Sequence, residues 1–193
     1  MPAESECLPP PCDSRTSTRV TARQSDRPVL PVAAGALVAT VASLAWFGTR
    51  PAMRVLVGTE ALEQTVPLAY QVAVFPAFGA LSAVVLVRLR GHGRNDRMGL
   101  ATVALVAISS GAAGLRLAGW VPLSGHALFL SAAALYAATL PEMRALRLSL
   151  VLSVSGLAVT AWYKLAVWGD AGWFAVSCAA GCLLGWVLAR AAR

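Results

Sequence analysis

Six apolar runs, each about as long as a membrane-crossing helix, follow one another along this chain and limit the folds that it can adopt. An α-helix rises about 1.5 Å per residue, so a run of roughly 20 residues crosses a hydrocarbon core of about 30 Å. Charged residues make up only 13% of the sequence and hydrophobic residues 58%, whereas soluble domains carry about 25% charged residues. The sequence therefore predicts an all-α, polytopic transmembrane helical bundle. Its expected spans are residues 29–48, 66–87, 98–118, 121–140, 148–168 and 171–189.

The N-terminal segment, residues 1–27, differs in composition from the rest of the chain. It is rich in Pro, Ser, Thr and charged residues and holds few large apolar side chains. Such a segment buries too little apolar surface to fold alone. We therefore predict a disordered cytoplasmic tail over residues 1–27 and a transmembrane helical domain over residues 28–193. The first apolar run has the length of a full span, which argues against a cleaved signal peptide.

The basic residues divide unequally between the two sides of the predicted bundle. With a cytoplasmic N-terminus, twelve of them fall on the cytoplasmic side and four on the outer side. Cytoplasmic loops of membrane proteins carry an excess of basic residues, so we predict a multi-pass cell-membrane protein with both termini in the cytoplasm. Because the arginines are spread over short loops, the net charge of +7 does not predict a nucleic-acid partner. The twelve are Arg15, Arg19, Arg23, Arg27, Arg88, Arg90, Arg94, Arg97, Arg144, Arg147, Arg190 and Arg193, and the four are Arg50, Arg54, Arg116 and Lys164.

Three local features refine the predicted bundle. Pro76 lies in the middle of the second span and predicts a kink, because proline removes a backbone donor from the helix. The third span, residues 98–118, is rich in Gly, Ala and Ser, which favours close packing inside the bundle. The fourth span reaches full length only if residues 124–126 (SGH) are included, so we expect SGH to lie inside the end of the bundle.

Polar residues from four spans meet on the predicted outer side. Arg116 ends the third span, and Ser124 and His126 begin the fourth. Lys164, the only lysine in the protein, lies near the end of the fifth span, and Asp170 begins the sixth. Ionisable groups within spans are costly and tend to be paired or functional. We therefore predict a candidate site at this level, and the six-residue separation of Lys164 and Asp170 allows an ion pair within it.

A purely structural role explains the same residues. The long side chains of Arg116 and Lys164 can extend to the membrane boundary. A belt of tryptophans, Trp120, Trp162, Trp168 and Trp173, would mark that boundary. In this interpretation His126 is a hydrogen-bonded residue at a helix start.

The segment VPLSGHALFL, with Pro122, Ser124, Gly125 and His126 at the outer start of a span, resembles the PSGH motif of the type-2 phosphatidic acid phosphatase family. Members of that family are six-span enzymes that act on lipid phosphates. The resemblance implies that the backbone and the serine of SGH hold the phosphate, and that the histidine is the acid for the leaving group.

The segment WYKLAVWGDAGWFAVSCAAGCLLGW is similar in arrangement to the family's third motif and to the Gly-rich span that follows it. The similarity rests on Lys164, Asp170, Gly181 and Gly185. It implies that Asp170 orients or charge-balances a partner in the site.

The sequence departs from the family pattern in three places. Leu123 separates Pro122 from Ser124. No histidine precedes Asp170, where the family has its nucleophile. The nearest counterpart of the first motif, Arg50–Pro51, lies too far upstream.

Two classes of function follow from these residues. The first is a divergent lipid or isoprenoid phosphate or diphosphate phosphatase, or a phosphotransferase, with an outward-facing site. The imidazole of histidine suits proton transfer near neutral pH. The second class is non-enzymatic: a small accessory subunit of a membrane complex or a small transporter component, with a helix-packing partner or a second copy of the chain. Membrane lipids are partners in both. The candidate residues are His126 and Asp170 for catalysis and Arg116, Ser124, Gly125 and Lys164 for substrate binding.

The sequence leaves open whether the protein is an enzyme. No metal ion or other cofactor is expected. The roles of His92 and of Cys7, Cys12, Cys178 and Cys182 also stay open.

Overall fold

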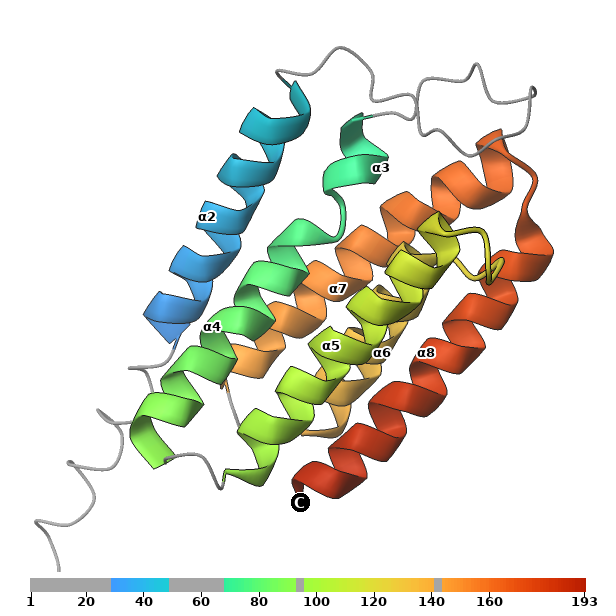
Figure 1. Ribbon diagram of the computed structural model, residues 1–193. Helices are drawn as coiled ribbons and strands as arrows, with labels where there is room; N and C mark the ends of the chain where they lie inside the picture. Colours follow the sequence, from blue (N-terminus) through green and yellow to red (C-terminus); the bar gives the residue numbers. More distant parts are fainter. Residues whose placement is uncertain (1–28, 49–67, 93–95, 141–143) are drawn as a thin grey trace, which may run out of the picture.

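The computed structural model describes residues 29–48, 68–92, 96–140 and 144–193, and within these ranges the chain folds as a bundle of helices (Figure 1). The all-α helical bundle predicted from the sequence is confirmed. The predicted tail, residues 1–27, and the loop that carries Arg50 and Arg54 lie outside the described residues. The elements are α2 (Val29–Gly48), α3 (Leu68–Val72), α4 (Phe75–His92), α5 (Arg97–Leu117), α6 (Gly125–Thr139), α7 (Arg144–Trp162), η1 (Tyr163–Val167) and α8 (Ala171–Ala192).

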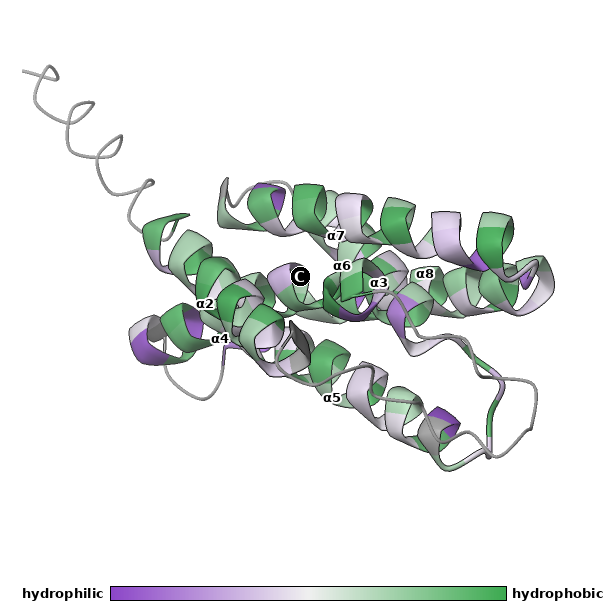
Figure 2. Ribbon diagram, turned by 90° about the horizontal axis from the view of Figure 1, so that it is seen from above, coloured by the Kyte–Doolittle hydropathy of each residue, from purple (hydrophilic) through white to green (hydrophobic). Residues whose placement is uncertain are grey.

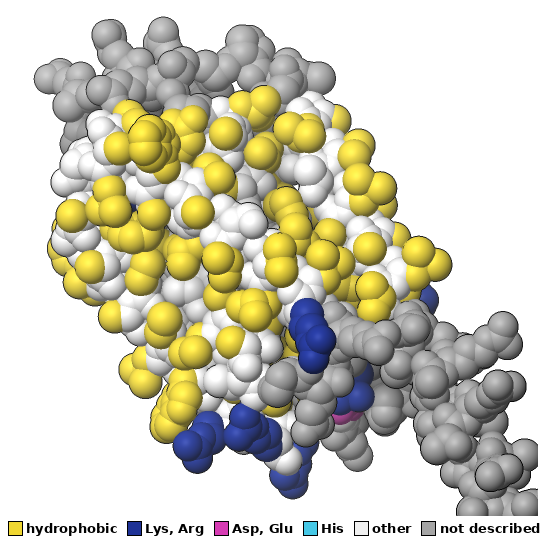
Figure 3. Space-filling view, turned by 180° about the vertical axis from the view of Figure 1, so that it is seen from behind, with side chains coloured by type: hydrophobic (Ala, Val, Ile, Leu, Met, Phe, Trp, Pro, Cys, Tyr) yellow, Lys and Arg dark blue, Asp and Glu magenta, His cyan; other side chains and the backbone are white. Residues whose placement is uncertain are grey.

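The helices run alternately up and down, so the bundle has two ends (Figure 1). One end holds the C-terminus of α5, the start of α6 and the junction of η1 with α8. We call it the His126 end. The opposite end shows a group of basic side chains below a largely apolar surface (Figure 3). We call it the arginine end, and it holds Arg88, Arg90, Arg97, Arg147, Arg190 and Arg193.

Large apolar side chains lie on the outside of the bundle. Leu30, Leu37 and Leu183 are each more than half exposed, and apolar residues continue along the length of the helices (Figure 2). Water would not support such a surface, whereas lipid would. Among the described residues, five helices are long and apolar enough to cross a membrane, so the chain is an integral membrane protein. These helices are Val29–Trp46, Leu68–Gly91, Arg97–Arg116, Ala145–Val167 and Ala171–Ala192.

The fourth predicted span is occupied by a helix that begins late and ends early. α6 has 15 residues, a length of about 22 Å. Ser124 is its N-cap, and Leu140 ends it with φ −120° and ψ 62°. Leu140 precedes Pro141 in the sequence, and a residue before proline disfavours helical geometry. Most of α6 is nevertheless buried, because α5, α7 and α8 all pack against it.

The second predicted span is interrupted at the turn before Pro76. α3 ends at Val72 and α4 begins at Phe75, with a two-residue turn at Ala73 and Val74. Pro76 has no backbone N–H to donate to the carbonyl of Val72, and its ring crowds that carbonyl. The kink predicted from the sequence is therefore confirmed as a local break in the helix.

Four residues at every fourth position of α8 form its buried face: Ser177, Gly181, Gly185 and Ala189. A Cβ atom at Gly181 would meet the side chain of Ser131, and one at Gly185 would meet the backbone of Ala132. The two glycines therefore let α8 approach the backbone of α6 closely, in the manner of small residues at helix interfaces in membranes.

The expectation that the third span lies inside the bundle is wrong. The enclosed helix is α6, whereas α5 has only one buried side. Gly111 and Gly114 of α5 are exposed, and a Cβ atom added at either would meet nothing within 4 Å. Small residues allow two helices to approach closely, but the amino-acid composition of a helix does not show which of its faces has a neighbouring helix.

The packing of α8 on α6 predicts a difference between two glycine substitutions. Gly185→Leu forces a side chain against the backbone of Ala132 and should destabilise the protein by roughly 1–3 kcal/mol, the usual cost of overpacking. Gly111→Leu is the matched control, because it adds the same side chain to an exposed position. Thermal unfolding of both variants in one mild detergent measures the difference. Equal melting temperatures would contradict the assigned packing.

Candidate functional site

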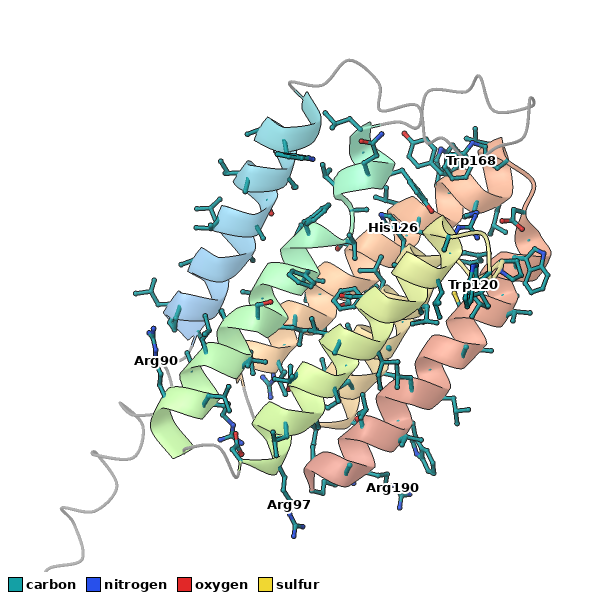
Figure 4. All side chains as sticks on the ribbon, viewed as in Figure 1. Arg90, Arg97, Trp120, His126, Trp168 and Arg190 are labelled. Atoms are coloured by element: carbon teal, nitrogen blue, oxygen red, sulfur yellow. The ribbon has the colours of Figure 1, made fainter. Side chains whose placement is uncertain are left out.

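The polar residues predicted to meet do so at the His126 end. Figure 4 shows His126 among the helices, with Trp168 above it. Ser124 is buried, as expected if SGH lies inside the end of the bundle. Lys164 is also buried, so its side chain lies inside the end of the bundle rather than on its surface.

Lys164 and Asp170 form the ion pair that their spacing allows. The Lys164 Nζ atom lies 2.7 Å from Asp170 Oδ2, and the two side chains are 7% and 28% exposed. The backbone N–H of Asp170 also donates to the carbonyl of Lys164 at 2.8 Å. Asp170 stands at the N-cap position of α8 but makes no side-chain capping bond there. Its carboxylate is thus used to neutralise the lysine rather than to cap the helix.

A π-helical turn brings Lys164 to this position. η1 continues α7 with a wider turn, in which the N–H of Trp168 donates to the carbonyl of Tyr163 at 3.0 Å. Gly169 follows with a φ of +64°, a left-handed conformation that favours glycine. The chain then reverses into α8 at Asp170. The wide turn and the glycine together direct Lys164 inward and Asp170 back towards it.

His126 is held on two sides. Its ring stacks on Tyr70 with centroids 4.6 Å apart and an interplanar angle of 30°, and it is hydrogen-bonded to the backbone of Gln71. Gln71 lies just before the break in the second span. The Nε2 atom of His126 is buried and has no hydrogen-bond partner among the described residues. A buried polar atom without a partner costs about 1–3 kcal/mol, so Nε2 is a hydrogen-bonding atom that the described residues leave unused.

Ser124 connects the start of α6 to its neighbours. Its side chain accepts a bond from the N–H of Ala127, and its own N–H donates to Ser177 Oγ at 2.7 Å. Its hydroxyl is also hydrogen-bonded to the side chain of Tyr70. Gly125 packs against α5, where an added Cβ would lie 2.8 Å from that of Ala113. Ser124 and Gly125 therefore fix the position from which His126 projects.

Arg116 holds the segment that leads into α6. Its Nη1 atom donates to the carbonyl of Pro122 at 2.5 Å and to that of Leu123 at 3.1 Å. α5 ends one residue later, at Leu117, and a Schellman-type cap follows in which Gly119 adopts a φ of +78°. The guanidinium therefore places a positive charge beside the start of α6.

Aromatic side chains surround the polar cluster. Tyr70 makes edge contacts with Trp168 at 4.8 Å and with Tyr163 at 6.1 Å between ring centroids. Lys164 Nζ lies 5.3 Å from the centre of the Trp168 ring, within the range of a cation–π interaction. Trp120 and Trp162 are strongly exposed at the same end, as a tryptophan belt at a membrane boundary would be.

The sequence identified most of these residues but missed three. Tyr70 and Gln71 gave no signal, because nothing in the sequence shows that the break at Pro76 turns them towards His126. Ser177 stands in the same four-residue row as Gly181 and Gly185, so the row itself could have indicated a contact with α6.

The described residues contain no group of three or more His, Cys, Asp or Glu side chains that could hold a metal ion. No family model, curated protein sequence or solved structure matches this chain.

The ion pair predicts a coupled response to substitution. Lys164→Met and Asp170→Asn should each destabilise the protein by roughly 1–3 kcal/mol, because each leaves a partly buried charge without its partner. The double variant should be more stable than the sum of the two changes predicts. Thermal unfolding of the four proteins in the same detergent measures the coupling. Strict additivity would show that the two side chains act independently.

Proposed function

We propose that this integral membrane protein acts on a lipid or isoprenoid that carries a phosphate or diphosphate, as a phosphatase or phosphotransferase. Its site is the cluster at the His126 end, which faces the outer side of the cell membrane. The observation that carries the proposal is the buried Nε2 atom of His126, which lacks a partner among the described residues while the ring is fixed by Tyr70 and Gln71.

The charges of the cluster suit an anionic group. Arg116 and Lys164 contribute two positive charges and Asp170 one negative charge, which leaves one net positive charge near His126. The start of α6 adds backbone N–H groups that have no carbonyl partner within the helix. A phosphate at this level would therefore meet a positive potential in surroundings that are mostly apolar.

The proton-transfer step belongs to His126. When the P–O bond to the leaving group breaks, the leaving oxygen needs a proton. The Nε2 atom of His126 can take that proton from the attacking water or hydroxyl compound and pass it to the leaving oxygen. Water or another hydroxyl compound attacks the phosphorus and supplies the new P–O bond. Arg116 and Lys164 neutralise the phosphate, and Asp170 balances Lys164. This division of roles agrees with the resemblance of SGH to the PSGH motif.

A non-enzymatic role as an accessory subunit or small transporter component is favoured by a different observation. Gly111 and Gly114 leave open space on the exposed side of α5, where the helix of a partner could approach closely. In that role the polar cluster would serve only to hold the helix ends together.

Release of phosphate from a panel of lipid phosphates and isoprenoid diphosphates separates the two functions. The wild-type protein, purified in mixed micelles, should hydrolyse at least one member of the panel. His126→Gln should lower the rate by roughly 100-fold or more, the usual contribution of a general acid. His92→Gln is the matched control, since His92 is the only other histidine and lies at the arginine end.

The enzyme function would be contradicted if the folded wild-type protein released no phosphate from any member of the panel. A folded His126→Gln variant with full activity would exclude His126 as the proton donor. Thermal unfolding of each variant establishes that a loss of rate is not a loss of fold.

A further inference from the structure

We propose a second site at the arginine end, which binds the phosphate headgroup of an anionic phospholipid between α6 and α8. The site is a cavity of about 210 Å³, lined by Thr139, Trp186, Ala189, Arg190 and Arg193. A single water needs only about 10–15 Å³, so the cavity has room for a larger polar group. It lies at the opposite end of the bundle from His126 and is independent of the proposed function.

Two arginines give the cavity its positive charge. Arg193 donates from Nη2 to the carbonyl of Thr139 at 2.5 Å, which attaches the end of α8 to the end of α6. The described acidic side chains do not neutralise this charge. Asp96 pairs with Arg88, and Asp170 pairs with Lys164 at the other end. Within the described residues, the guanidinium groups of Arg190 and Arg193 therefore have N–H groups left for a phosphate, which arginine binds well.

Trp186 gives the cavity an apolar wall. It precedes Arg190 by four residues, so the two side chains share one face of α8 about 6 Å apart along the helix axis. The Arg190 Cζ atom lies 4.9 Å from the centre of the Trp186 ring. Figure 4 shows Arg190 at the lower end of α8. In an anionic phospholipid the charged phosphate lies outside the apolar acyl chains. Arg190 and Trp186 are arranged in the same order, with the basic group outside the exposed aromatic ring.

The position of Trp186 makes the site directly measurable. The other five tryptophans, Trp46, Trp120, Trp162, Trp168 and Trp173, all lie towards the His126 end, and Trp186 is the one at the arginine end. The difference in fluorescence between the wild-type protein and Trp186→Phe is therefore the signal of Trp186. Lipids with brominated acyl chains quench a tryptophan that they touch.

The experiment uses the full chain in phosphatidylcholine nanodiscs with a small fraction of brominated phosphatidylglycerol or, in parallel, brominated phosphatidylcholine. Brominated phosphatidylglycerol should quench Trp186 at lower fractions than brominated phosphatidylcholine. Arg190→Gln should reduce this preference roughly fivefold, the effect of one arginine beside an anionic lipid. Arg97→Gln is the matched control, because it removes one charge from the same end outside the cavity (Figure 4).

Three outcomes would overturn the proposal. Equal quenching by the two lipids would show that the cavity does not select an anionic headgroup. If Arg97→Gln and Arg190→Gln reduced the preference for brominated phosphatidylglycerol equally, the preference would come from the general surface charge and not from the cavity. Displacement of the brominated phosphatidylglycerol by soluble glycerol phosphate would assign the cavity to free phosphate compounds rather than to a lipid.

Discussion

Close contact between α8 and α6 is the interaction on which the rest of the bundle depends. The row of Ser177, Gly181, Gly185 and Ala189 brings the backbone of α8 against that of α6. α6 is thereby enclosed, and an enclosed helix does not have to span the hydrocarbon core on its own. Its 15 residues can begin at Ser124, inside the end of the bundle. The same row supplies Ser177, whose hydroxyl oxygen accepts a hydrogen bond from the backbone N–H of Ser124.

The late start of α6 creates the polar cluster at the His126 end. A helix that continued through Ser124 would use the backbone N–H groups of this segment in its own hydrogen bonds. Because α6 instead begins here, His126 lies in the first turn, against Tyr70 and the backbone of Gln71. The break before Pro76 and the π-helical turn at Lys164 are two further departures from regular helix at the same level. Irregular backbone at membrane depth is tolerated where protein surrounds it, and such departures are frequent at functional sites.

Sequence reasoning predicted the helical bundle, the kink at Pro76 and the pairing of Lys164 with Asp170, because each follows from local properties: apolar run length, a missing backbone donor and a short separation of opposite charges. It failed where the answer depends on which helices are neighbours. The Gly-rich composition of α5 predicted an interior helix, yet α6 is the enclosed one. Gly181 and Gly185 resembled part of a family motif, and their observed contacts are with α6. Tyr70 could not be found at all, since its contact with His126 joins two distant segments.

The most direct test of this account is the side of the membrane on which each end of the bundle lies. In a protein without its four native cysteines, single cysteines replace Ala118 at the His126 end and Gly91 at the arginine end, both exposed. An impermeant thiol reagent applied to intact cells should label Ala118→Cys, and it should label Gly91→Cys only after the cells are opened. Labelling of Gly91→Cys in sealed cells, with protection of Ala118→Cys, would invert the bundle and contradict an outward-facing site at His126.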